Sequence, residues 1–129
     1  MCKICDQNPK AHSFFKIATE SGTHIYYSCP AEATNYWDKE SVANHCREKL
    51  QEKGNAKWIF VFDGMGYTLR HAIAIGVAHR FLGVIKEYAD TLIEIRIVNM
   101  SKHVATMIGI MRPFIPTKIY KKINWETFN

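Results

Sequence analysis

Several features that mark familiar protein classes are absent from this sequence of 129 residues. No apolar run approaches the roughly 20 residues that are needed to span a bilayer. The seven glycines and four prolines are scattered, so no flexible linker divides the chain, and we expect a single domain over residues 1–129. The first residues are polar and do not form a signal peptide, so we expect a cytoplasmic protein.

The sequence also lacks the glycine-rich loops that bind nucleotides. Gly64-Met65-Gly66 follows an expected strand, but Leu69 stands at the third glycine position of the dinucleotide motif, and no Gly-Lys-Ser/Thr triplet occurs. We interpret this segment as a tight turn out of the strand, with Asp63 capping it. No His-Glu-x-x-His motif or Gly-x-Ser-x-Gly elbow is present. We therefore expect neither a cofactor nor catalysis.

The four cysteines do not form a complete metal motif. Cys2-Lys3-Ile4-Cys5 has the spacing of half a zinc site, but structural zinc sites usually show two such pairs, and the second is missing. Residues that could complete a site are spread along the chain: His12, His24, Cys29, His45 and Cys46. Cys46 falls on the apolar stripe of an expected helix, which favours core packing. In a cytoplasmic protein we expect reduced thiols and no metal.

Positive charge is concentrated in the second half of the chain. Residues 1–64 carry eight Lys/Arg and eight Asp/Glu, whereas residues 65–129 carry nine and four, so the whole net charge of +5 lies there. A basic surface suits a phospholipid headgroup, an anionic membrane or nucleic acid, although it can also serve solubility alone. Lysines and aromatic residues are interleaved over 118–125, but no nucleic-acid recognition module matches, so we do not expect nucleic acid as a partner.

Hydrophobic periodicity predicts alternating helices and strands. Residues 58–62 are apolar at every position, as expected for a central strand buried on both faces. A long helix separates this strand from the next, and such a βαβ crossover makes a parallel sheet. The expected elements are helix 8–21, strand 23–29, helix 38–53, strand 58–62, helix 68–88, strand 93–98, helix 102–111 and strand 118–125. We expect Phe14, Phe15 and Ile17 on the apolar side of the first helix and Gly22 to end it. We expect Asp38 or Ser41 to cap the helix over 38–53 and Ser101 to cap the helix over 102–111. Together these elements predict an α/β fold with a mostly parallel sheet of about four strands flanked by helices.

The order of several short motifs resembles one family of lipid-binding domains. These motifs are Phe62-Asp63-x-x-Gly66, Tyr88-Ala89-Asp90-Thr91-Leu92, Ile97-Val98-Asn99, Met111-Arg112-Pro113-Phe114-Ile115 and Lys118-Ile119. In this order they resemble the CRAL-TRIO family, which includes yeast-type phosphatidylinositol transfer proteins, and the resemblance is strongest over residues 58–123. It implies a bowl whose floor is the sheet, whose rim is helical and whose interior holds the acyl chains of a lipid.

The resemblance also implies which residues form the lipid site. Five apolar residues would belong to a segment that gates the mouth of the bowl: Met107, Ile108, Met111, Phe114 and Ile115. Methionine suits such a segment because its flexible side chain adapts to changing apolar contacts. Three polar residues would hold a phospholipid or phosphoinositide headgroup: Asp90, Thr117 and Lys118. A lysine provides a point charge for phosphate, and a carboxylate accepts hydrogen bonds from inositol hydroxyls.

The length of the chain limits what kind of pocket it can hold. An empty apolar cavity of about 1,000 Å³ would cost on the order of 20 kcal/mol, which exceeds the stability of a typical domain. A chain of 129 residues must keep such a pocket filled, shrink it, or complete it with a second copy in a homodimer. We expect non-catalytic lipid binding, for transfer or presentation, with transient contact to anionic membranes. The alternative is a protein-interaction module of the same fold with a closed pocket.

Overall fold

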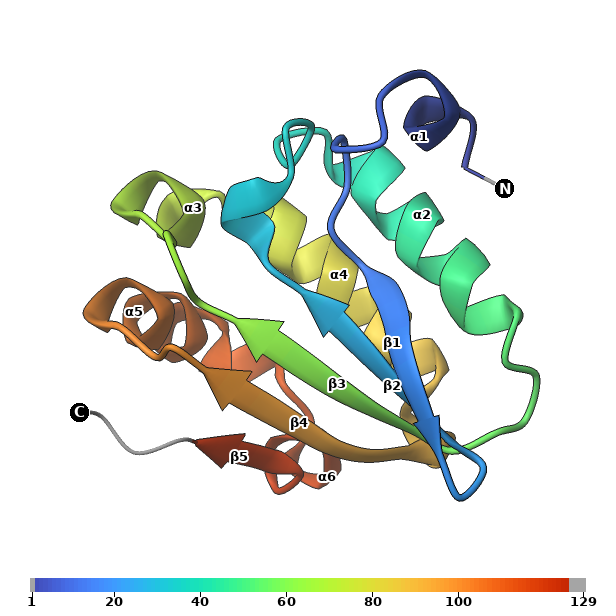
Figure 1. Cartoon of the computed structure of the whole chain (residues 1–129). Helices are drawn as coiled ribbons and strands as arrows, with labels where there is room; N and C mark the ends of the chain where they lie inside the picture. Colours follow the sequence, from blue (N-terminus) through green and yellow to red (C-terminus); the bar gives the residue numbers. More distant parts are fainter. Residues whose placement is uncertain (1, 126–129) are drawn as a thin grey trace.

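A computed structural model describes residues 2–125 and places them in two layers, one of strands and one of helices (Figure 1). Five strands form the sheet in the order in which they occur in the chain: β1 (Phe15–Glu20), β2 (Thr23–Ser28), β3 (Trp58–Asp63), β4 (Leu92–Val98) and β5 (Ile123–Trp125). β1 and β2 are antiparallel, and the other neighbours are parallel. The predicted α/β fold with a mostly parallel sheet is therefore confirmed, with five strands in place of about four.

All helices except α1, which precedes β1, lie in the connections between the parallel strands. The α-helices are α1 (Lys3–Gln7), α2 (Lys39–Gln51), α3 (Leu69–Ile73), α4 (Ile75–Glu87), α5 (Lys102–Met111) and α6 (Thr117–Tyr120). Short 3₁₀ turns are η1 (Pro30–Glu32), η2 (Ala89–Thr91) and η3 (Arg112–Phe114). The predicted caps of two helices are confirmed, because Asp38 accepts a hydrogen bond from the Ser41 amide and Ser101 accepts one from the Val104 amide.

All parallel connections run in the same direction across the sheet, so their helices lie on one face. Each right-handed crossover carries its helix over the same side when the sheet grows toward one edge only. Figure 1 shows α2, α4 and α5 on the far side of the sheet, and among residues 2–125 no helix covers the side toward the viewer. The prediction that β3 is buried on both faces is wrong: Trp58 and Phe60 are buried against the helices, while Ile59 and Val61 are only half-buried.

The helix predicted over residues 8–21 is wrong, because this segment contains β1. Its apolar residues Phe15 and Ile17 alternate with lysine and alanine, which is the period of a strand rather than of a helix. Ser21 and Gly22 both have positive φ angles, 51° and 81°, as the tight turn of a two-residue hairpin requires. Gly22, which we expected to end a helix, instead turns the chain from β1 into β2.

Two other predicted elements are shorter than expected. The helix over 68–88 is interrupted at Ala74, whose ψ angle of 61° separates α3 from α4. The strand over 118–125 begins only at Ile123, because residues after Pro116 form the single turn α6 first. That turn is closed by a hydrogen bond from the Tyr120 amide to the Pro116 carbonyl. The alternation of apolar residues could not reveal this turn, because Ile119 would be buried whether the segment formed a strand or a helical turn.

Candidate functional site

An apolar cavity of about 130 Å³ lies between the covered face of the sheet and the helices. Parallel pairing brings Phe60 opposite Ile95 and Phe62 opposite Ile97, so these side chains form one wall together. The helical walls come mainly from α2, α4 and α5: Val42, His45, Cys46, Val77, Ala78, Phe81, Leu82, Ile85, Met107, Ile108 and Met111. Cys46 is fully buried, as the prediction of core packing required. This arrangement can accommodate an apolar group and offers few polar partners.

Four of the five predicted gate residues line this cavity. Met107, Ile108 and Met111 point into it from α5, and Ile115 reaches it from just beyond η3. Phe114 does not line the cavity: its side chain is 49% exposed and packs edge-on against the ring of His79 on α4. We refer to residues 107–115 as the gate segment, which forms one side of the cavity.

The three predicted headgroup residues lie at the surface. The Lys118 ammonium contacts the Asp90 carboxylate at 3.1 Å, so the structure brings α6 and η2 together there. Thr117 is exposed beside Lys118 at the start of α6. Both partners of this ion pair are largely exposed, and such surface pairs contribute little to stability. An incoming anionic group could therefore displace Asp90 from Lys118 at small cost.

Asp63 organises the turn at the carboxyl end of β3. Its two carboxylate oxygens accept hydrogen bonds from the Tyr27 hydroxyl at 2.5 Å, the Asn99 amide at 2.8 Å and the Met65 backbone N–H at 2.9 Å. Burial alone would raise the pKa of Asp63, but these three donors hold it below its ordinary value. Gly66 follows with a φ angle of 74°. The prediction of a tight turn capped by Asp63 is confirmed, and the carboxylate serves the fold.

Replacement of Asp63 by asparagine is expected to lower the free energy of unfolding at neutral pH by about 1 to 3 kcal/mol, because hydrogen bonds to a charged acceptor are lost. Since the folded-state pKa of Asp63 is lowered, its contribution is full above the ordinary carboxyl pKa and disappears as pH falls through the lowered value. Urea unfolding at a series of pH values would show the two proteins converging in acid. Asp90→Asn, at a 94% exposed carboxylate, is the control, and a pH-independent difference for Asp63→Asn would contradict the assignment.

The cavity contains residues that sequence reasoning did not single out. Phe81 packs edge-on against Phe60 with ring centroids 5.3 Å apart, and Val77 and Ile85 lie on the same side of α4. The apolar density of this helix was visible in the sequence, but the side that faces the cavity depends on how α4 crosses the sheet. His12 and His45 also line the cavity, and no sequence motif placed them there.

A two-layer α/β fold with an apolar cavity between its layers defines a class of domains that can enclose an apolar ligand. In its fold the chain is similar to the solved protein titled "Crystal structure of Sfh5". The TM-score is 0.68 at 14% sequence identity, over 93% of this chain and 50% of that chain. The chain thus spans half the length of this structural relative, and the likeness concerns the fold.

The family follows from the sequence match. The model of the CRAL/TRIO domain matches residues 36–127, so the chain belongs to the CRAL/TRIO domain family, as its motifs predicted. CRAL/TRIO proteins are in general lipid-binding or lipid-transfer proteins rather than catalysts. No curated protein matches the chain significantly. Within residues 2–125, no helix has the length and apolar character needed to cross a membrane.

Proposed function

We propose that this chain binds a phospholipid without catalysis, with acyl chains between the sheet and the gate segment and the headgroup near Lys118. The observation that carries the proposal is the apolar cavity in a CRAL/TRIO domain, lined by four of the five residues that the family resemblance assigns to the gate. Lys118 and the exposed Thr117 next to it offer a cation and a hydroxyl for a phosphate group, and Asp90 offers a carboxylate for inositol hydroxyls. The basic second half of the chain favours transient contact with an anionic membrane from which such a lipid is taken.

The small volume of the cavity bears on how a lipid enters. An empty cavity of about 130 Å³ costs about 3 kcal/mol at roughly 24 cal/mol per Å³, which a domain of ordinary stability tolerates. A phospholipid needs more room, so its binding requires the gate segment to move away from α4 and the sheet. Such a movement would break the edge-on contact of the exposed Phe114 side chain with His79.

The same small volume favours a second candidate function. A CRAL/TRIO domain whose cavity stays closed would act as a protein-interaction module, and exposed apolar side chains such as Phe15 and Ile17 on β1 would then be available to a partner. Native mass spectrometry of the untagged chain, with organic extraction of bound molecules, distinguishes the two candidates. A stoichiometric lipid supports the proposal, whereas an apo chain that also takes up no lipid from vesicles supports the interaction module. A doubled mass would show that two chains form the unit.

Filling the cavity is expected to abolish lipid binding while the fold is retained. Ala78 lines the cavity from α4, so the phenylalanine ring in Ala78→Phe would occupy space that acyl chains need. Ala105→Phe is the matched control, because Ala105 is exposed on α5. We expect lipid uptake from phosphatidylcholine vesicles, with and without phosphatidylinositol, to fall at least about tenfold for Ala78→Phe alone. Equal uptake by both folded variants would exclude this cavity as the site, and dependence on phosphatidylinositol would support the headgroup assignment.

A further inference from the structure

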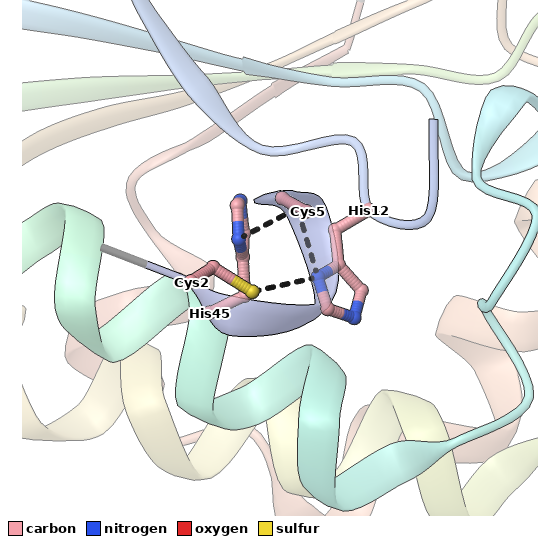
Figure 2. Close-up of side chains that lie close together, drawn as sticks. All are labelled: Cys2, Cys5, His12 and His45. Carbon is pink, nitrogen blue, oxygen red and sulfur yellow. Dashed lines mark hydrogen bonds between the residues drawn. The ribbon is translucent and has the colours of Figure 1, made fainter. Parts of the chain in front are cut away.

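Four side chains that can ligate a metal meet beside α1: three from the N-terminal segment and, from α2, His45 (Figure 2). Cys5 Sγ lies 3.4 Å from His12 Nδ1 and 3.6 Å from His45 Nδ1, and Cys2 Sγ lies 3.6 Å from His12 Nδ1. All four ligand atoms lie within 4.8 Å of one another. Cys2, His12 and His45 are buried and Cys5 is half-buried, so the cluster is sheltered from water.

The spacing of these atoms suits a tetrahedral ion. Zinc binds sulfur at about 2.3 Å and imidazole nitrogen at about 2.0 to 2.1 Å, so two such ligands of a tetrahedral ion stand about 3.5 to 3.6 Å apart. The three sulfur–nitrogen distances of 3.4 to 3.6 Å agree with this separation. The remaining pairs of ligand atoms lie within 4.8 Å of one another, and small side-chain rotations can bring them to the separation that a tetrahedral ion requires.

Outer hydrogen bonds engage Nε2 of both histidines, so that Nδ1, which faces the cysteine sulfurs, can bind a metal ion through its lone pair. His45 Nε2 lies 2.8 Å from the Phe14 backbone carbonyl, which can only accept, so Nε2 carries the hydrogen and Nδ1 keeps its lone pair. His12 Nε2 lies 3.1 Å from Ser41 Oγ, which donates its own hydrogen to the Asp38 carbonyl and can accept from the ring. Metal-binding histidines typically have such an outer partner, which fixes the tautomer and the ring orientation.

The weak packing of α1 against the rest of the domain also favours a bound metal ion at this cluster. None of the five residues of α1 is buried, and a helix of this length is not stable by itself. The thiols of Cys2 and Cys5, at the start and within the helix, are directed at His12 on the following loop and at His45 on α2. Metal coordination would join these three segments where apolar packing does not.

We propose that Cys2, Cys5, His12 and His45 bind a structural Zn²⁺ ion that anchors α1 to α2. Two thiolates and two imidazoles are the ligands of closed, four-coordinate zinc sites, and their softness disfavours Mg²⁺ and Ca²⁺. The set leaves no coordination position for a substrate, so the ion supports the fold. Because His12 and His45 also line the apolar cavity, the ion would stiffen that wall opposite the gate segment.

The test is metal analysis of the untagged full chain, purified in reducing buffer without chelator. We expect about one zinc ion per chain, consistent with a single four-ligand site. After the metal is removed under reducing conditions, Co²⁺ should give the intense visible bands of a tetrahedral complex and a thiolate-to-cobalt charge-transfer band. Zn²⁺ should displace Co²⁺, and hydrogen exchange of the amides in α1 should be slower in the zinc form than in the apo form.

Substitutions decide whether these residues bind the metal. Cys5→Ser and His12→Gln should each lower the retained zinc and the affinity for Co²⁺ at least about tenfold. Cys29→Ser and His103→Gln are the matched controls, because these side chains lie outside the cluster, and they should retain the ion. Circular dichroism checks that each variant folds, and the Co²⁺ spectrum of the unmodified chain gives an answer even where a variant does not. A reduced chain that binds neither Zn²⁺ nor Co²⁺, a Cys2–Cys5 disulfide that persists in reducing buffer, or equal metal retention by folded Cys5→Ser would overturn the proposal.

Discussion

Replacement of Trp58 by alanine is expected to destabilise the chain by about 3 to 5 kcal/mol, which approaches the whole stability of many domains. Trp58 is the largest fully buried side chain, at the start of β3. Its ring packs edge-on against Tyr26, and its Nε1–H donates a hydrogen bond of 2.9 Å to the Tyr88 carbonyl. The substitution therefore leaves a cavity and also removes a donor that ties the end of α4 to the sheet.

Urea unfolding followed by far-ultraviolet circular dichroism measures this loss without relying on tryptophan fluorescence. Trp37→Ala is the control, because the Trp37 side chain is 41% exposed and its ring contacts are with Arg70, His71 and the neighbouring Tyr36. We expect that variant to lose at most about 1 kcal/mol. Similar losses for the two variants would mean that the core is not centred on β3.

Replacement of Gly64 by alanine is expected to destabilise the protein by about 1 to 3 kcal/mol or more, because no space exists for the added methyl group. A Cβ atom at Gly64 would lie 2.6 Å from the Asn99 carbonyl oxygen and 2.9 Å from Cγ2 of Val104, which is fully buried in α5. The end of β4 or the start of α5 would have to move. Since α5 carries most of the gate segment, the same substitution should weaken lipid uptake as well.

Gly109→Ala is the matched control for Gly64→Ala and should have the opposite sign. Gly109 lies inside α5 with nothing near the position of an added Cβ, so alanine should stabilise the helix by about 0.5 to 1 kcal/mol. Thermal and urea unfolding of the two variants side by side would measure both effects. Equal and small effects would show that the close approach of Gly64 to Asn99 and Val104 does not exist in solution.

The sequence predicted those parts of the fold in which the spacing of apolar residues agrees with the residues that cap helices or form turns. Asp38 and Ser101 cap the helices that they were expected to cap, and the motif order from Phe62 to Lys118 identified the family. The prediction failed for β1, because Phe14, Phe15 and Ile17 were taken as one side of a helix. Phe15 and Ile17 in fact alternate with other residues along β1, as in a strand. The open face of β3 was also missed, since an apolar strand looks the same whether its second face is covered or not.

The sequence revealed some residues of the candidate sites and not others. The family resemblance directed attention to Met107, Ile108 and Met111, and the structure places all three along the cavity on α5. The four-residue cluster was not, because its expected second pair of ligands does not exist as a pair: His12 comes from a loop and His45 from α2. Only the packing of α2 beside the N-terminal segment brings them to Cys2 and Cys5. That the cysteines are metal-free was an expectation, and the zinc measurement tests it.

The agreement between strand order and chain order has a consequence for biosynthesis. A ribosome releases β1 and β2 first, and each later strand can then pair with the free edge that the preceding strand has just provided. None of the strands within residues 2–125 has to enter between two that are already paired, so this part of the growing chain need not reopen the sheet that it has formed. Among the described elements the gate segment and β5 emerge after the other strands, so the cavity closes only after β2, β3 and β4 are available.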